Sequence, residues 1–508
     1  GASVEFAQNW LFDGGTYKYT GTSTATNRAA KINRETELNI ANKTATVTVS
    51  GTFEGDGDFA LGGEGQLTIS TPKFFGYKGA TILNGGTMYL STTEITKAGI
   101  GSSSKLVMAG GHLKTKGESK GDETYSFPIE VKEGTKSQFS PNRNCYIKSN
   151  VTGSGELQLN IPYLREYISS EWKDFTGRLI ANGVSSEKEG SLLLYNKGVA
   201  NFSYVVTLTG NARIGSWNTT ETNMSLGGLS GTSGTYLGGA GGKNTRNVKT
   251  TWTIGSANTH ETFAGKINNW SPGGSAYSGT VNIVKVGTGD WRLTGANDYK
   301  GTTKVNGGAL IVNGNNSGTG AVSVAAEAVL KGKGTLAGKV TVAEGATVYA
   351  GDTLINNETL KLTGGCTVNA GGIVEIPLYS DGETARANKI KVGKQFEVND
   401  AVLNLNLNEA EDIADDQVFT IFDLTGTTVS GTGFKTIQPE TPSGTQHWDT
   451  HELLVTGKIY VRNNKTSSVD GVKADSDKNA PKYDLSGRRT GDVSKGLYIQ
   501  NGKKYVNK

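Results

Sequence analysis

The chain has 508 residues and a mass of 53.4 kDa, about three times the usual length of a single domain, so either several domains or one long repetitive body is expected. Glycine occupies 72 positions but proline only 9, which excludes a collagen and a low-complexity linker. The net charge of +4 is spread along the chain and excludes the basic footprint of a nucleic-acid-binding protein. Two cysteines and three methionines exclude a disulfide scaffold and a methionine-rich groove.

The two cysteines and the N-terminus bear on the compartment and on processing. Cys145 and Cys366 each lie in an alternating apolar segment, and we interpret them as two small buried thiols rather than as a disulfide or redox pair.

No segment reaches the roughly 18 apolar residues of a membrane helix. The first residues, Gly1-Ala2-Ser3, lack the charged and apolar regions of a secretion signal. We therefore expect a soluble, already processed chain that does not insert into a membrane.

The chain contains an internal repeat. Tyr77–Leu90 matches Tyr299–Val312 in register and without a gap. Downstream of Tyr299, glycines at intervals of 18 to 19 residues each precede a short apolar run: Gly301, Gly320 and Gly338. The runs are Thr302–Val305, Ala309–Val312, Ala321–Val324, Lys339–Val342 and Ala346–Ala350. A period of this length is typical of solenoids.

The short runs predict strands, because they alternate in polarity and are rich in β-branched residues. An antiparallel sandwich would explain the turn frequency equally well, but the period favours a solenoid in which each coil lies above its counterpart. We expect Val305, Leu310 and Val312 to face inward, and Asn84-Gly85 and Asn306-Gly307 to form corners, where glycine permits a positive φ or a close backbone approach. The glycine-rich segment 227–242 shows no clear strand and predicts a loop.

The segment Trp291–Thr303, with its Leu-Thr-Gly, Asn and Tyr-Lys-Gly-Thr-Thr elements, resembles the autotransporter-associated β-strand repeat of secreted bacterial passenger proteins. The resemblance is strong over residues 278–352 and fainter elsewhere. It implies a right-handed parallel β-helix that serves as a scaffold, and it implies nothing catalytic.

The C-terminal segment has its own pattern. Residues 463–481 are polar and predict a linker. Beyond it, Tyr483–Arg489 and Lys495–Val506 predict two strands joined by a turn. These residues resemble the C-terminal sorting region of secreted Bacteroidetes proteins, which implies export to the medium or the outer cell surface and contact with a secretion machinery. An ordinary terminal hairpin is the alternative.

The resulting domain organisation has four parts. We predict an N-terminal solenoid over 1–190 and a β-helix with passenger-type repeats over 191–462. The linker 463–481 and the sorting-type segment 482–508 follow.

Candidate metal ligands are few. His447 and His451 have the spacing of a helical zinc site, but the following Glu452–Val455 predicts a strand, which would hold the two imidazoles ~13 Å apart. His112 and His260 belong to unrelated coils. The acidic run 54–58 alternates like a Ca²⁺ loop yet is interpreted as a turn, and the acidic cluster 409–416 as a solvated loop or short helix. We expect no cofactor; Ca²⁺ is the ion that these segments would suit.

The segment Ile161–Phe175 interrupts the repeat and predicts a short helix or excursion beside the solenoid. Tyr163, Arg165, Tyr167 and Trp172 combine aromatic faces with a hydrogen-bonding group, the mixture that stacks and orients sugar rings. We take these four as candidate ligand-binding residues. A packing plug or cap of the solenoid is the alternative interpretation.

The leading hypothesis is a secreted or surface-displayed, non-catalytic β-helix, adhesin-like or accessory to a polysaccharide-degrading system. It would bind polysaccharide or a cell-surface glycan, as a monomer and without nucleic acid. One alternative is a polysaccharide lyase of the pectate-lyase kind, with a Lys or Arg base such as Arg143, Lys148, Arg165 or Lys173. The other is the structural stalk of a longer secreted enzyme.

Overall fold

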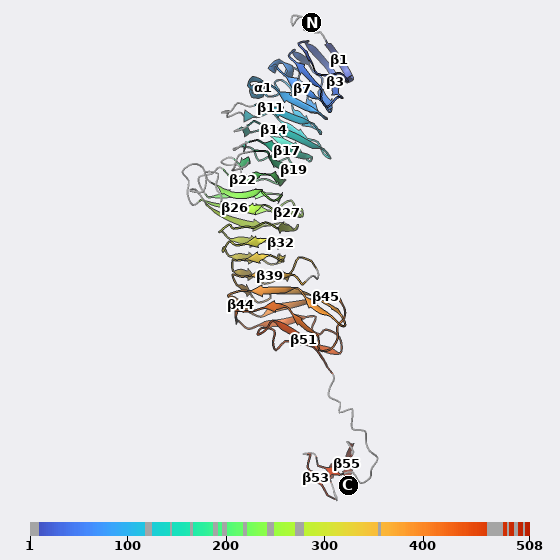
Figure 1. Cartoon of the computed structure of the whole chain (residues 1–508), viewed down its shortest axis with the longest axis vertical. Helices are drawn as coiled ribbons and strands as arrows, with labels where there is room; N and C mark the ends of the chain where they lie inside the picture. Colours follow the sequence, from blue (N-terminus) through green and yellow to red (C-terminus); the bar gives the residue numbers. More distant parts are fainter. Residues whose placement is uncertain are drawn as a thin grey trace.

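The computed structural model describes residues 10–507 with several gaps. The gaps are 117–123, 143–144, 163–165, 186–190, 196–200, 217–220, 241–247, 270–278, 354–356, 465–480, 485–486, 492–495 and 501–502. In the described residues the predicted fold class is confirmed: the protein is a right-handed parallel β-helix. Figure 1 shows its coils stacked into one rod, from β1 (Trp10–Tyr19) at one end to β51 (Lys458–Asn463) at the other.

The walls of the rod are parallel sheets, and each coil adds one strand to each wall. Sheet A runs from β1 to β16 (Val151–Gly153). Sheet B continues from β2 (Thr24–Thr26) to β49 (Phe434–Gln438) along the whole rod. The third wall is sheet C, from β12 (Thr124–Tyr125) to β28 (Lys266–Ile267), and then sheet E, from β33 (Asn315–Asn316) to β47 (Phe422–Asp423). Sheet D, from β23 (Thr222–Leu226) to β48 (Thr428–Ser430), replaces sheet A in the second half.

Sheet B therefore crosses residue 190 without a break. Strands β17 (Glu156–Ile161), β19 (Arg178–Gly183) and β21 (Val205–Gly210) pair in parallel over six residue pairs each. The segments 1–190 and 191–462 therefore share sheet B as one wall. They differ in another wall, which is sheet A in the first segment and sheet D in the second.

Alternation of apolar residues explains why these segments form strands. In β17 and in β29 (Thr280–Lys285) every second side chain is buried in the lumen, while the others face outward. Val305, Leu310 and Val312 are buried, which confirms their predicted inward orientation. Both cysteines are free and buried, so the prediction of two buried thiols is also confirmed.

The Tyr-x-Gly element of the repeat has a physical explanation. Tyr299 is buried, and its hydroxyl lies 2.6 Å from the Thr303 hydroxyl; Tyr77 and Thr81 repeat the same contact at 2.6 Å. A buried phenol needs such a partner, because an unpaired hydroxyl in the lumen costs free energy. The glycine between them lies against the preceding coil: a Cβ at Gly301 would come within 2.2 Å of the Val281 carbonyl oxygen.

Lys285 is a charged group within the lumen wall. It is 1% exposed, and its Nζ donates to the carbonyl oxygens of Val286 at 2.7 Å, Gly307 at 3.1 Å and Gly287 at 3.2 Å. Its ammonium thus holds the corners of two successive coils together. Burial lowers the pKa of Lys285 to about 8, against an opposing effect of Asp290.

This lysine predicts a pH dependence of stability. In the unfolded chain the amine loses its proton near its ordinary pKa, and in the folded chain already near pH 8. Between these two pKa values the unfolded state holds more protons than the folded state. The free energy of unfolding therefore increases by up to about 3 kcal/mol as the pH is raised from about 8 to the ordinary lysine pKa. Thermal unfolding at pH 7.5 to 10.5 should show this slope, and Lys285→Met should lack it. Equal slopes in the two proteins would contradict the prediction.

Four expected elements differ from the structure. Residues 166–168 form strand β18 (Glu166–Ile168) between β15 (Tyr146–Ile147) and β20 (Ser191–Tyr195), so the predicted helix over 161–175 is wrong there. Pairing with two neighbouring coils overrides the local pattern. The predicted loop over 227–242 contains β24 (Gly228–Gly231) and β25 (Tyr236–Ala240) for the same reason, since β24 lies between β21 and β27 (Glu261–Phe263).

The other two lie near the C-terminal end of the rod. Strand β45 (Ala401–Asp412) extends through most of the acidic cluster, because it pairs with the long β41 (Ile373–Asp381) as far as Asp412. Residues 452–455, expected as a strand, lie within turns at 451–456 that return the chain to β51.

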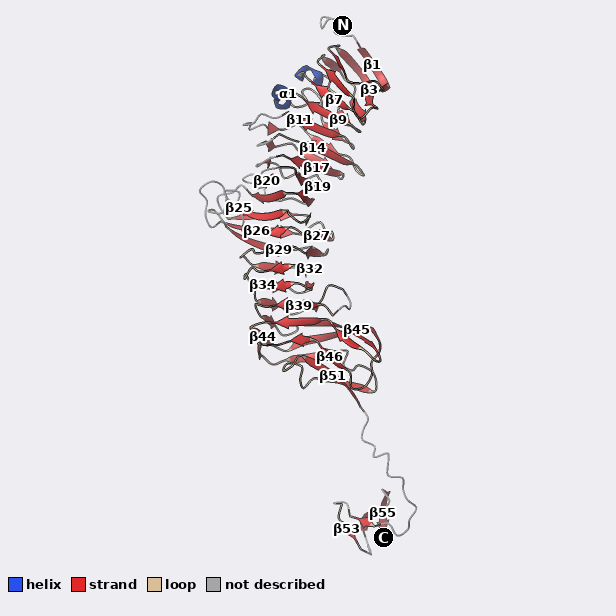
Figure 2. Ribbon diagram, in the orientation of Figure 1, coloured by secondary structure: helices blue, strands red, loops and turns tan. Residues whose placement is uncertain are grey.

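The two ends of the rod are built differently. At the C-terminal end, the antiparallel strands β46 (Val418–Thr420), β51 and β50 (Gln446–Asp449) form a cap. At the N-terminal end, β1 and β2 are the last described strands of their sheets. Figure 2 shows the two short helices, η1 (Pro72–Phe75) and α1 (Thr93–Ala98), on one side of the coils near that end. Neither has the length or apolar character needed to cross a bilayer.

The C-terminal residues form a separate small sheet. It contains β53 (Arg489–Thr490), β52 (Lys482–Tyr483), β54 (Gly496–Gln500) and β55 (Lys503–Asn507), all antiparallel, rather than the two strands expected. Tyr498 and Tyr505 stack across β54 and β55, although Tyr505 is exposed. Residues 465–480 of the predicted linker lie outside the described residues.

Candidate functional site

The outer side of sheet B carries two adjacent rows of polar side chains, which we call the ladder face. Its residues are Thr87, His112, Gln138 and Gln158 in one row, and Tyr89, Lys114, Ser140, Asn160, Asn182 and Thr209 in the other. They occupy equivalent positions on β9 (Thr87–Leu90), β11 (His112–Thr115), β14 (Lys136–Ser140), β17, β19 and β21. Successive coils stack at ~4.8 Å, so the two rows run straight along the rod.

The amides of the ladder face hold one another in place. Asn160 Nδ2 donates to Gln138 Oε1 and to Ser140 Oγ, both at 3.1 Å. Asn160 Oδ1 accepts from Gln158 Nε2 at 2.7 Å and from Asn182 Nδ2 at 2.9 Å. Thr209 continues the series with a 3.0 Å bond to Asn182 Oδ1. The result is a fixed array of donors and acceptors, half-buried except for the exposed Gln138, and the cost of ordering these side chains is already met before a ligand arrives.

A basic and aromatic group lies at the N-terminal end of the same rows. The Lys114 ammonium stands 5.3 Å from the centre of the Tyr89 ring. His112 Nε2 lies 2.7 Å from Ser140 Oγ, which connects the group to the amides. Burial, and secondarily Lys114, lowers the pKa of His112, so its imidazole is neutral near pH 7 and acts there as a hydrogen-bonding group.

An ion pair with a buried carboxylate lies on the same wall as the ladder face. The Arg178 guanidinium binds both carboxylate oxygens of Glu261, at 2.8 and 3.1 Å, and also the Thr207 hydroxyl at 2.8 Å. The Glu261 side chain is 6% exposed. The hydrogen bond to Glu261 is the main reason that the pKa of Arg178 is raised. This pair links β19 to β27 across the outside of the coils and fixes the relative position of these strands.

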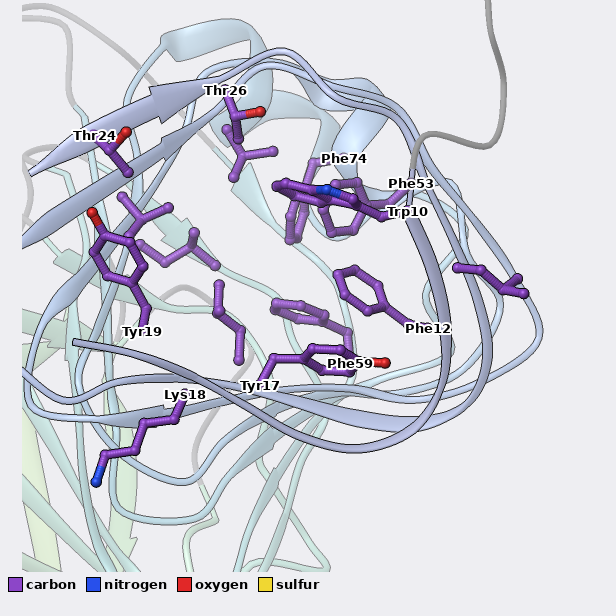
Figure 3. Close-up of a pocket in the computed structure, with 15 residues that line it drawn as sticks. Trp10, Phe12, Tyr17, Lys18, Tyr19, Thr24, Thr26, Phe53, Phe59 and Phe74 are labelled. Atoms are coloured by element: carbon purple, nitrogen blue, oxygen red, sulfur yellow. The ribbon is translucent and has the colours of Figure 1, made fainter. Parts of the chain in front are cut away.

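A second surface is the open N-terminal end of the lumen. A cavity of about 590 Å³ lies under β1 and β2, with an apolar lining that includes Trp10, Phe12, Phe53 and Phe74. Figure 3 shows Phe12 and Tyr17 facing each other, with ring centres 4.8 Å apart, while the Lys18 side chain points away. The cavity is lined by the same kind of core side chains that fill deeper coils. It suits an apolar group rather than an ion.

Of the four sequence-predicted binding residues, the structure describes Tyr167 and Trp172, and neither belongs to the ladder face or to the lining of the N-terminal cavity. Tyr163 and Arg165 lie outside the described residues, and Tyr167 is on β18 of sheet C. Trp172 is 1% exposed and stacks on Tyr204 with ring centres 5.4 Å apart, so its ring presents no face to a sugar. For Trp172 the structure matches the alternative interpretation, a packing plug.

The described residues among those singled out for lyase chemistry and for metal binding have the following surroundings. Arg143 lies outside the described residues, Lys148 is exposed after β15, and Lys173 pairs with Glu171 at 3.5 Å. His447 contacts Asn464, whereas His451 contacts Asp449, each at 2.7 Å. Within the described ranges, no three His, Cys, Asp or Glu side chains group as metal ligands.

Sequence reasoning missed the ladder face. The sequence assigns His112 only to a coil unrelated to the other histidines, and the amides lie in segments without a motif. The signal that could have revealed them is register: each is an outward residue at the same position of a coil. The register is hidden because the coils differ in length. Asn160 and Asn182 are 22 residues apart, but Asn182 and Thr209 are 27 apart.

Comparison with known proteins supports the interpretation of the repeat as a passenger-type repeat. The family model of the passenger-associated transport repeat matches residues 283–312, which contain the whole predicted motif Trp291–Thr303. No curated protein matches the chain. The matched repeat belongs to passenger proteins of autotransporters, and its presence implies that this β-helix is a scaffold of a secreted or surface-exposed protein.

Proposed function

We propose that the protein is a non-catalytic scaffold that binds an extended polysaccharide or cell-surface glycan along the ladder face. The observation that carries the proposal is the straight, mutually hydrogen-bonded series from Gln138 to Thr209. Sugar hydroxyls both donate and accept hydrogen bonds, and amide and hydroxyl side chains can meet both needs. Tyr89 adds an aromatic face on which a sugar ring can stack.

The dimensions of the face favour a linear polymer over a small ligand. The longer row, from Tyr89 to Thr209, extends over six coils, and equivalent groups recur at ~4.8 Å, a spacing that a chain of pyranose rings can follow. Each contact is weak, but many equal contacts on one chain add up to a useful affinity. Export, implied by the matched repeat, would bring the face into contact with such polymers.

The first test is a pull-down of the purified full chain with insoluble and soluble polysaccharides, in which bound protein and the ultraviolet absorbance of unsaturated products are read from the same tubes. We expect binding without new absorbance. New absorbance would favour the lyase alternative, and the absence of binding to every glycan would contradict the proposal.

The second test assigns the binding to the ladder face. We expect Tyr89→Ala and Gln138→Ala each to weaken the binding of the captured polysaccharide about tenfold, which corresponds to about 1.4 kcal/mol. The matched control is Tyr146→Ala, which removes a half-buried outward tyrosine from sheet C. Unchanged binding by both ladder variants, with folding verified by circular dichroism, would exclude this face.

A further inference from the structure

A groove near the C-terminal end of the rod lies between sheet E and the cap. It has a volume of about 550 Å³, within the range of small-molecule sites. Its lining includes Thr359 on β39 (Thr359–Leu362), Lys389 on β43 (Lys389–Val392) and Thr420 on β46. The turn after β50 closes one side with Val455 and Thr456. No residue of the ladder face is part of this groove.

Some charged side chains in and beside the groove form ion pairs, and one does not. Lys391 Nζ binds Asp423 Oδ2 at 2.7 Å, and this bond is the main reason that the pKa of Asp423 is lowered to about 2. Glu358, next to Thr359 in the chain, binds Lys333 at 2.9 Å. None of the described residues pairs with the half-buried Lys389. Among the described residues, the Lys389 ammonium in the groove therefore has no ion-pair partner, and an anion that reaches it would gain a charge-assisted contact.

The threonine hydroxyls of the groove also include some that are hydrogen-bonded and some that are not. Thr456 donates to Glu452 Oε2 at 2.9 Å, and Thr425 contacts Asp423. Thr359 and Thr420 make no side-chain hydrogen bond within the described part of the chain. Thr359 lies directly opposite Lys389 in the strand register. The unpaired groups of the groove are thus one ammonium and two hydroxyls, on neighbouring elements.

Apolar side chains complete the lining. Phe422 and Leu424 are buried beneath the groove, and Val455 is 73% exposed at its side. The apolar surface open to a ligand is therefore mainly that of Val455. A bare inorganic anion would leave it unused, whereas a sugar ring has apolar C–H faces as well as hydroxyls. The combination fits a pyranose ring with a single negative charge.

We propose that this groove binds a sugar residue that carries one carboxylate or sulfate group, with Lys389 as the counter-charge and Thr359 and Thr420 as partners for its hydroxyls. The proposal is independent of the ladder face, because it uses a different wall of the rod. It defines a site for acidic glycans at the capped end.

The experiment measures binding by isothermal titration calorimetry with the full chain. The probes are a galacturonic acid trisaccharide, a 6-sulfated galactose trisaccharide, a neutral galactose trisaccharide and sodium sulfate. We expect one or both acidic sugars to bind at least tenfold more tightly than the neutral sugar, and more weakly at higher salt. The carboxylated and sulfated arms identify which acidic group the site prefers. Equal binding of acidic and neutral sugars, no binding of either acidic sugar, or sulfate alone binding as tightly as the acidic sugars would overturn the proposal.

Matched variants locate the site. Lys389→Met should weaken the acidic sugar at least tenfold, and Thr420→Val about threefold. Lys361→Met is the control, because Lys361 is exposed on the same outer side of sheet E, beside Lys391 in register, but outside the groove lining. Unchanged binding by Lys389→Met would overturn the inference. Tyr89→Ala keeps the two proposals apart: it should weaken the extended polysaccharide and leave the acidic trisaccharide unaffected.

Discussion

Replacing Gly320 with alanine should destabilise the rod by about 3 kcal/mol or more, because its Cβ would collide with the backbone of the coil below. The ideal Cβ lies 1.8 Å from the Gly301 carbonyl oxygen and 2.5 Å from the Gly301 carbonyl carbon. A flexible side chain could move away, but a backbone carbonyl within a stack of coils cannot. Gly338 repeats the contact one coil further, 1.9 Å from the Gly320 oxygen. The collision would therefore separate two coils or shift the whole stack.

The thermal unfolding midpoint of the full chain, followed by far-ultraviolet circular dichroism, checks this expectation. Gly444→Ala is the control, since nothing lies within 4 Å of a Cβ at that position. It should change stability by less than about 0.5 kcal/mol. Equal midpoints for the two variants would show that the coils can separate at little cost, against the close stacking seen at Gly301, Gly320 and Gly338.

These three glycines also show what the sequence could predict. Their spacing of 18 to 19 residues indicated the solenoid, and the structure places each directly above the previous one. The inward residues followed from alternation in the same way. Both signals are local, since a strand and its corner lie within one coil. The fold class could therefore be predicted from this one sequence.

The ladder face could not be predicted from the sequence, because it depends on contacts between coils of different lengths. Asn182 binds Asn160 only if the coil between them has 22 residues, whereas the next coil, to Thr209, has 27. Nothing in the sequence marks where the extra residues leave the wall. Trp172 illustrates the opposite error: an aromatic residue in a polar segment indicated an exposed face, but the chain turns there with a φ of 47° and directs the ring inward.

Removing the Arg178 side chain should cost about 3–5 kcal/mol, because it leaves the Glu261 carboxylate buried without its partner. Arg178→Met retains most of the volume of the side chain but loses both bonds to Glu261 and the bond to Thr207. The carboxylate would then be desolvated without compensation, and the strands from β19 to β27 would lose their external link. The thermal midpoint of the variant should fall accordingly.

A double variant separates the pair from its surroundings. Arg178→Met with Glu261→Met removes both charges, and an apolar pair of similar volume often matches a buried ion pair in stability. We expect the double variant to recover most of the loss. Lys78→Met is the external control: its pair with Asp56 is 77% and 80% exposed, and losing it should cost less than about 1 kcal/mol. A double variant no more stable than Arg178→Met would mean that the arginine acts through Thr207 and Ser230 rather than by neutralising Glu261.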